Sequence, residues 1–280
     1  ILNPGCRFFD MRIGQSVTLS GGCITKHMAS KVNEIVAGKY DHKGESVVYG
    51  DTDSVYFSAY KTLQKEIKDG LIPWTKDSIL GLYDKISEEV NTSFKAFMTK
   101  AFHTPATRGE VIAAGRELVA SKGLFITKKR YALLYYDKEG KRTDLDGKEG
   151  KMKAMGLDLK RSDTPVFVQD FLSEILYMVL SGNEEKKVLD RISEFRAEFK
   201  SRPGWEKGSP KRANNMTKYQ AAEVAKGRAN MPGHVRASMN WNRCRDMYGD
   251  KYSMPILDGA KVIVCKLKNN PLGYTSIAYP

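Results

Sequence analysis

Two long segments of the chain carry apolar residues at helical spacing. In residues 11–38 the apolar positions lie three, four and seven residues apart, which predicts a helix. Gly21 and Gly22 interrupt this segment at some cost in helix propensity, and they would allow close packing against a neighbour. A similar stripe in residues 76–102 predicts a second long amphipathic helix whose apolar face belongs to the core.

Shorter patterns predict the elements between and after these helices. β-branched and aromatic residues flank the Gly-Asp-Thr-Asp sequence at 50–53, which predicts a β-hairpin with a tight turn. Residues 61–70 are polar and predict a short helix. Residues 107–137 are expected to form strands that end in a hairpin turn, and residues 138–153 are expected to form a solvated loop.

The second half of the chain is predicted to be mainly helical. Ser162 or Asp163 can cap a helix that has Pro165 in its first turn and ends at Gly182. Residues 201–233 are rich in Gly, Pro, Lys, Arg and Asn, and taken alone they predict a flexible basic linker. The other expected elements are helices over 184–200 and 234–248 and a strand over 261–267.

Composition narrows the class of protein and of partner. Of the 280 residues, 41% are hydrophobic, which is enough for a sizeable core. Lys and Arg number 46 against 33 Asp and Glu, so the net charge is +13. Such an excess indicates a polyanionic partner, and nucleic acid is favoured over a membrane surface. A basic protein without such a partner stays an open alternative.

The cysteines and the termini give weaker indications. The four cysteines are scattered without a CxxC pair, so neither a zinc site nor a disulfide framework is indicated, and a reducing, cytoplasmic location fits. No run of about 18 apolar residues occurs, so no membrane partner is expected. The sequence begins with Ile1 rather than Met, and we interpret it as a processed piece or an expressed fragment of a longer protein.

The expected hairpin carries two carboxylates, Asp51 and Asp53. Side chains two residues apart lie on the same side of an extended chain, so both acids would face one way. Paired carboxylates repel each other unless a cation neutralises them, and Mg²⁺ binds one or two carboxylates together with phosphate oxygens. The alternative is an ordinary turn, since Asp and Gly are common turn residues.

A basic motif, Lys128-Lys129-Arg130-Tyr131, follows further along the chain. Three consecutive cations before an aromatic residue suit a phosphate backbone with a base or sugar stacked beside it. A generic basic strand is the alternative.

The two motifs, in this order, resemble those of family B DNA polymerases of the tailed-bacteriophage type. Tyr-Gly-Asp-Thr-Asp-Ser at 49–54 is similar to the family's third polymerase motif, and Lys-Lys-Arg-Tyr is similar to its primer-gripping motif. The resemblance implies an α+β fold, with an antiparallel palm over residues 1–160 followed by a mainly helical thumb over residues 161–280. The catalytic hairpin would lie near 46–58 and the primer-gripping strand near 124–136.

The resemblance also implies roles for individual residues. Asp53 and Asp51 would be catalytic and would bind two Mg²⁺ ions, for which Mn²⁺ could substitute, while Thr52 would contact the dNTP. Glu110, on the strand expected before the basic motif, would be a further metal-binding carboxylate, unless it is simply an exposed strand residue. The primer-template DNA would be held by Lys128, Lys129, Arg130, Tyr131, Asn214, Asn215, Lys218, Tyr219, His234 and Arg236.

Other motifs of the family are absent from these 280 residues. They lack the first motif, an Asp followed by Ser-Leu-Tyr-Pro-Ser, the fingers motif and an exonuclease region. The chain would therefore contribute part of an active site, and a partner chain would carry the N-terminal polymerase half. The alternative hypothesis is a non-catalytic module that only binds duplex DNA.

Overall fold

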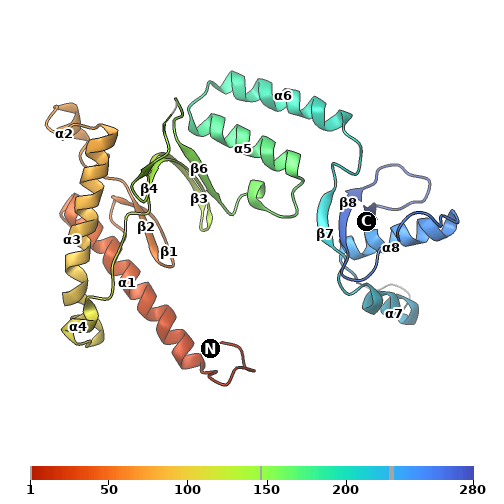
Figure 1. The fold of residues 1–280 in the computed structure, drawn as a ribbon, viewed down its shortest axis with the longest axis horizontal. Helices are drawn as coiled ribbons and strands as arrows, with labels where there is room; N and C mark the ends of the chain where they lie inside the picture. The colour runs from red at the N-terminus through yellow and green to blue at the C-terminus, as the bar shows by residue number, and fades with distance from the viewer. Residues whose placement is uncertain (1, 146, 227–229) are drawn as a thin grey trace. The chain divides into compact units, whose positions relative to one another are not determined.

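The computed structural model describes residues 2–145, 147–226 and 230–280, with the backbone alone at 223–226. The chain packs as two compact units. The first consists of Ile1–Ser121, Phe125–Lys129 and Tyr135–Lys151, and the second of Lys122–Leu124, Arg130–Leu134 and Met152–Pro280. Helices combine with antiparallel sheets, which confirms the α+β class (Figure 1). Whether palm and thumb divide at residue 160 is a functional prediction that this packing does not test.

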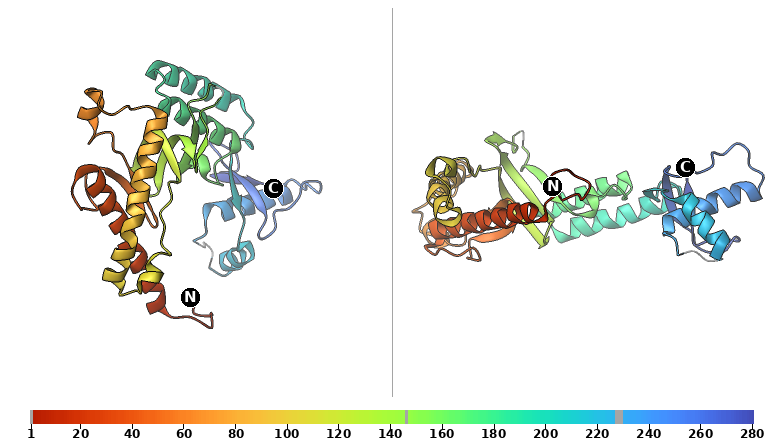
Figure 2. Two further views of the ribbon diagram at one scale, coloured as in Figure 1. Left: turned by 60° about the vertical axis from the view of Figure 1, so that its left-hand side comes forward. Right: turned by 90° about the horizontal axis from the view of Figure 1, so that it is seen from below.

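Two long helices form the frame of the first unit. Helix α1 covers Met11–Ala37 and α3 covers Lys76–Phe102, as the apolar stripes predict, and the two pack against each other (Figures 1 and 2). Asp10 caps the start of α1, since its side chain accepts a hydrogen bond from the backbone amide of Arg12. Gly38 caps the end of the helix in the left-handed conformation. The buried residues between the helices and the hairpin strands are Val32, Ile86, Val90 and Phe94.

Gly21 and Gly22 do not interrupt α1, which is continuous through them. The close packing expected there is also not found, because among the described residues no atom of another element lies within 4 Å of where a Cβ would stand. The lost propensity of about 1 kcal/mol per glycine is small beside the packing of a 27-residue helix.

The strands expected from residue 107 begin only at Leu118. Residues Ala106–Gly109 form a short helix, α4, and the chain then runs without regular structure to β3, which covers Leu118–Thr127. The Asn91 side chain explains this, because it bonds both the amide and the carbonyl of Ala114 at 2.6 and 2.9 Å. A side chain of α3 thus satisfies backbone groups that a strand neighbour would otherwise pair.

A small sheet contains the basic motif. Strand β4, Arg130–Lys138, pairs with β3, with β5 (Lys141–Arg142) and with β6 (Lys151–Met155). The primer-gripping stretch expected as one strand over 124–136 is therefore two strands, and its two lysines form the turn between them. The predicted hairpin turn after β4 is confirmed, with Glu139 and Gly140 both in the left-handed region.

The segment 138–153 is only in part the solvated loop that its charge predicts: Leu145 and residues 147–149 are exposed outside any strand or helix, but other residues are held by ion pairs. Its Arg142 donates to both carboxylate oxygens of Asp144 at 2.8 Å, and Lys76 of α3 pairs with the same carboxylate. Only 4% of the Asp144 side chain is exposed. Ion pairs with α3 therefore hold Arg142 and Asp144, and local sequence patterns do not predict such contacts between distant residues.

Helices α5 (Val166–Leu180) and α6 (Glu185–Ser201) lie side by side in the second unit (Figure 1). The rings of Phe171 and Phe195 stack at 3.6 Å between centroids. The predicted caps at Ser162 and Asp163 are wrong, because α5 begins directly after Pro165 without a side-chain cap. A short 3-10 helix, η1 (Asp158–Lys160), precedes this segment.

The region predicted as a linker contains regular structure. Strand β7 (Ser209–Arg212) pairs with β8 (Lys261–Lys266), which pairs with β9 (Ser276–Tyr279). Because β7 is a polar edge strand containing Pro210, it lacks the apolar alternation that would predict it. Helices α7 (Met216–Lys226) and α8 (Gly233–Met247) share a core with this sheet, built around Met216, Val235, Met239, Ile256 and Val262.

The first unit also contains α2 (Gln64–Lys68) and the strands β1 and β2 described below.

The Asp144 ion pairs predict a specific pH dependence of stability. Hydrogen bonds from Arg142, and then from Lys76, hold the pKa of the Asp144 carboxyl well below its usual range. Their contribution is therefore complete above the unfolded pKa of about 3.9 and is lost as pH falls toward the lower folded pKa. Asp144→Asn should destabilise the chain by a constant amount at neutral pH, and the difference from wild type should shrink below about pH 4.

Urea unfolding between pH 7 and pH 3 would measure this difference. Asp69→Asn is the matched control, since Asp69 is exposed at the end of α2 and has no side-chain partner among the described residues. A penalty for Asp144→Asn that stays the same at pH 3 would contradict the interpretation.

Candidate active site

The two candidate acids lie at the tip of a two-stranded hairpin. Strand β1, Val47–Asp51, pairs with β2, Ser54–Phe57, and Asp51 stands opposite Ser54. Thr52 and Asp53 form the turn between them. The predicted hairpin is thus present. The expectation that Asp51 and Asp53 lie on the same side of an extended chain does not apply, because Thr52 between them has a φ of 49° and is not extended.

The left-handed conformation of Thr52 is unusual for a β-branched residue. Such backbone strain costs about 1–3 kcal/mol and persists only where neighbours hold it in place. Here the Thr25 hydroxyl of α1 donates to the Thr52 carbonyl at 2.8 Å, and the Thr52 hydroxyl donates to Asp51 Oδ1 at 3.1 Å. Helix α1 therefore fixes the turn that carries the acids.

The two carboxylates have different surroundings. Asp51 is half-buried, and its Oδ2 accepts a hydrogen bond from the Tyr49 hydroxyl at 3.3 Å. Asp53 is exposed, and within the described part of the chain its side chain has no hydrogen-bond or ion-pair partner. Asp51 is thus held in place, while Asp53 is available to an external cation.

Tyr49 joins this hairpin to the basic turn. Its hydroxyl accepts the backbone amide of Lys129 at 2.8 Å while it donates to Asp51. Its ring also lies 5.5 Å from that of Phe125 on β3, and the Tyr56 ring lies 5.7 Å from the same Phe125 ring. The structure therefore places the turn of the acidic motif beside the turn of the basic motif.

The members of the basic motif differ in exposure. Lys128 and Lys129 are exposed in the turn, and Lys129 has a φ of 62°. Arg130 is also exposed at the start of β4. Tyr131 is only 7% exposed, so its ring has little free surface for stacking in this conformation.

Glu110 is not brought together with Asp51 and Asp53. It lies at the end of α4 rather than on a strand, and its exposed carboxylate pairs with Lys95 of α3. The hydrogen bond from Lys95 lowers the Glu110 pKa. Among the described residues, no three His, Cys, Asp or Glu side chains are grouped as a metal site.

The predicted DNA contacts of the second unit lie on two segments that share one core. Asn214, Asn215 and Lys218 are exposed at the start of α7, whereas Tyr219 is half-buried against the core. On α8, Arg236 is exposed and His234 is half-buried. The sequence predicts these residues but not the Tyr49–Lys129 bond, for which the only signal is the position of Tyr49 two residues before Asp51 on one strand.

Comparison with known proteins decides the family. The model of DNA polymerase family B matches residues 77–228, which are more than half of the chain. The chain belongs to DNA polymerase family B. The resemblance of its motifs is thereby confirmed at the level of the family, although the matched residues begin after the acidic hairpin.

Individual curated relatives extend the match over nearly the whole chain. It is 31% identical to the DNA-directed DNA polymerase of Escherichia phage RB69 and 30% identical to that of Enterobacteria phage T4, over 99% and 98% of its residues. It is 26% identical to DNA polymerase II of Escherichia coli (strain K12) over 90%. The chain spans 31%, 30% and 27% of the length of these relatives.

The Tyr49 bridge can be tested by removing one oxygen atom. Tyr49→Phe should keep the ring contacts but leave the Lys129 amide without its acceptor, so that amide should exchange with solvent faster. The free energy of unfolding should fall by about 0.5–1.5 kcal/mol, as for the loss of an ordinary hydrogen bond.

Hydrogen exchange followed by NMR, together with urea unfolding, would measure both effects. The control is Tyr60→Phe, because the Tyr60 hydroxyl has no partner among the described residues. Unchanged exchange at Lys129 in Tyr49→Phe would show that the bond does not hold the basic turn.

Proposed function

We propose that this chain is the palm–thumb portion of a DNA-directed DNA polymerase, which extends a primer on a template with deoxynucleotides from dNTPs. The observation that carries the proposal is the Tyr49 bridge between Asp51 and the Lys129 backbone. Metal-binding acids and cations for the primer backbone would then act side by side. Family membership supports the reaction class, and the assignment to this part of a polymerase is our inference.

The acids of the hairpin tip suit a hard divalent cation. Asp53 and Asp51 offer only oxygen donors, which is the ligand type that Mg²⁺ and Mn²⁺ prefer. We infer that Asp53 is the principal ligand and that Asp51 shares or supports it. Glu110 would join them only after it leaves Lys95. When bound, two Mg²⁺ ions would lower the pKa of the primer hydroxyl and neutralise charge on the pyrophosphate.

The reaction is phosphoryl transfer. The primer 3′-oxygen forms a bond to the α-phosphorus of the dNTP, the bond from that phosphorus to the bridging oxygen breaks, and pyrophosphate leaves while the hydroxyl proton passes to solvent. Lys128, Lys129 and Arg130 would neutralise the primer phosphates near this end, with Tyr131 beneath them. Thr52, exposed in the turn, would contact the nucleotide.

The second unit would also contact the duplex. Asn, Lys, Arg and His side chains are suitable donors to phosphate oxygens, and such contacts position a protein on DNA without reading its sequence. The proposed contacts are Asn214, Asn215, Lys218, Tyr219, His234 and Arg236.

The remaining part of the active site would come from outside these 280 residues. Two-metal transfer needs carboxylates on both sides of the metal pair, and the hairpin supplies one side. The sheet of β1 and β2 has only two strands among the described residues, and such a hairpin gains stability from a third. We infer that a partner chain with the family's first motif completes it. An apolar surface at the start of the first unit would receive that chain; its exposed residues are Leu2, Phe8, Phe9, Met11, Ile13, Val17 and Leu19.

A reducing location, the cytoplasm of the host if a phage encodes the chain, is also proposed. Cys6, Cys23, Cys244 and Cys265 are all free thiols. Among the described helices, none has both the length and the apolar character needed to cross a membrane.

Asp53→Asn tests the catalytic assignment. The amide keeps the shape of the side chain but loses the charge that a metal ligand needs. In the chain mixed with a polypeptide carrying the exonuclease, fingers and first-motif regions, primer extension should fall by more than the roughly 100-fold cost of losing an outer metal partner. DNA binding should remain.

The measurement is extension of a labelled primer with Mg²⁺ and dNTPs. Asp69→Asn, which removes an exposed acid of α2, should extend normally, and the unmixed wild-type chain should not extend at all. Normal extension by Asp53→Asn would refute the metal assignment. Absence of extension in every mixture, with duplex binding intact, would favour the non-catalytic DNA-binding module instead.

The basic turn should contribute a sequence-independent and salt-sensitive part of DNA binding. Each lost phosphate contact lowers the slope of log affinity against log salt by about 0.9. We expect a flatter slope for Lys128→Gln combined with Lys129→Asn, where Asn tolerates the left-handed backbone of position 129.

Fluorescence anisotropy of labelled duplexes across a salt series would measure the slope. The control Lys85→Gln removes a cation from the exposed side of α3 and should leave the slope closer to wild type. Equal slopes in the turn variant and wild type would exclude phosphate contacts at the turn.

A further inference from the structure

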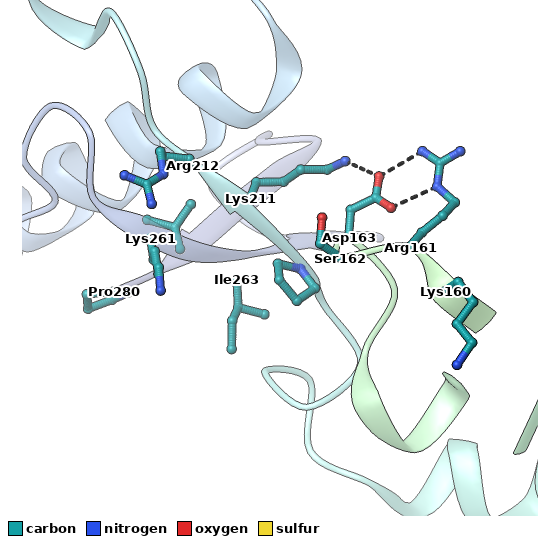
Figure 3. A pocket seen from close by; sticks show the side chains of 11 residues that line it. Lys160, Arg161, Ser162, Asp163, Lys211, Arg212, Lys261, Ile263 and Pro280 are labelled. Atoms are coloured by element: carbon teal, nitrogen blue, oxygen red, sulfur yellow. Dashed lines mark hydrogen bonds and ion pairs between the residues drawn. The ribbon is translucent and has the colours of Figure 1, made fainter. Parts of the chain in front are cut away.

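A strongly basic cleft in the second unit is separate from every residue assigned above. It lies between the segment 160–163 and strands β7 and β8, and its volume is about 1150 Å³ (Figure 3). Five of its lining residues are cations and one is an acid; they are Lys160, Arg161, Lys211, Arg212, Lys261 and Asp163.

The one acid bonds two of the five cations. Asp163 Oδ1 accepts from Arg161 Nε at 2.9 Å, and its Oδ2 accepts from Arg161 Nη2 at 3.0 Å and from Lys211 Nζ at 2.6 Å. Figure 3 shows the Asp163 carboxylate between the two basic side chains. Both oxygens are thus engaged in the forked geometry with which Arg also binds a phosphate.

The other three cations are free of such pairing. Lys160, Arg212 and Lys261 have no carboxylate partner in the part of the chain that the structure describes. The hydrogen bonds from Arg161 and Lys211 hold the pKa of Asp163 far below its usual range, so its charge is constant at physiological pH. The Asp163 side chain is 24% exposed, so solvent and solutes can reach it.

We propose that this cleft binds phosphates of the primer-template backbone and that Asp163 is a built-in competitor for two of its cations. The proposal rests on the proposed function, since it takes the polymerase substrate as the ligand. A phosphodiester would have to replace the carboxylate at Arg161 and Lys211, exchanging one negative group for another. Binding would therefore be weakened, which suits a surface along which duplex must move after each addition.

Asp163 could instead orient Arg161 and Lys211 for the phosphate, and the two roles give opposite results. If Asp163 competes, its neutralisation frees two cations and strengthens binding. If it only orients them, its neutralisation lets both side chains move and weakens binding.

The experiment compares Asp163→Asn with Asp158→Asn by anisotropy of a labelled duplex, without Mg²⁺ or dNTP. Asp158 is the matched control because it lies in the same segment, is exposed, and approaches Arg161 only to 3.8 Å. Asp163→Asn should bind up to about fivefold more tightly than Asp158→Asn, the upper end of the range for release of one exposed ion pair. Its salt slope should be steeper by about 0.9, one added phosphate contact.

Two further measurements test the competitor role of Asp163 and the phosphate chemistry of the ligand. Adding Lys211→Gln to Asp163→Asn should remove most of the gain, since it removes a freed cation. Inorganic tripolyphosphate, titrated directly, should bind Asp163→Asn more tightly than Asp158→Asn, because the freed cations accept phosphate groups; equal binding to the two variants would overturn the assignment of phosphate binding to this cleft.

Affinity of Asp163→Asn equal to or below that of Asp158→Asn would overturn the competitor role. Thermal unfolding of each variant shows that it is folded, and Asp163→Ser gives a second neutral variant with the same expected gain. Primer extension by the mixed chains is measured separately, so failure of this proposal and failure of the polymerase assignment are distinguishable.

Discussion

The Tyr49 hydroxyl is the interaction on which the candidate site depends. It accepts from the Lys129 amide and donates to Asp51, so a single oxygen atom fixes the distance between a turn of acids and a turn of cations. A hydroxyl can do this because it has both a proton and lone pairs, whereas Phe would keep only the ring packing. The acids of one turn and the lysines of the other are thus held close together without forming an ion pair among the described residues. Asp53, Lys128 and Lys129 stay exposed to solvent.

The frame that positions Tyr49 is the packing of α1, α3 and the hairpin. Buried Val90 and Phe94 of α3 share a core with Val32 of α1, and strand residues Val47 and Phe57 pack against it. Thr25 of α1 then holds the strained turn through the Thr52 carbonyl. Strain of about 1–3 kcal/mol at a turn is tolerated only where such a core supports it, which links the long apolar stripes to the geometry of two acids.

The sequence predicts what local patterns encode. The extents of α1 and α3 follow from their long apolar periodicity, and the hairpin follows from its turn and its flanking residues. It does not predict contacts between distant residues, such as the Tyr49–Lys129 bond across 80 positions or the pairing of Lys76 with Asp144. The pairing of Lys76 with Asp144 holds part of a segment that is expected to be a loop. The bonds from Asn91 to Ala114 likewise accompany irregular structure where a strand is expected.

The aspartates of this chain differ in their surroundings. Several acids of this basic chain are paired with a cation, as Asp144 is with Arg142 and Asp163 is with Arg161. Asp53 has no such partner within the described residues, and neither has Asp69 at the end of α2, so the lack of a cation does not by itself distinguish Asp53. What sets Asp53 apart is its position: it lies next to the strained Thr52 in the same turn as Asp51, and Tyr49 holds that turn beside the basic one.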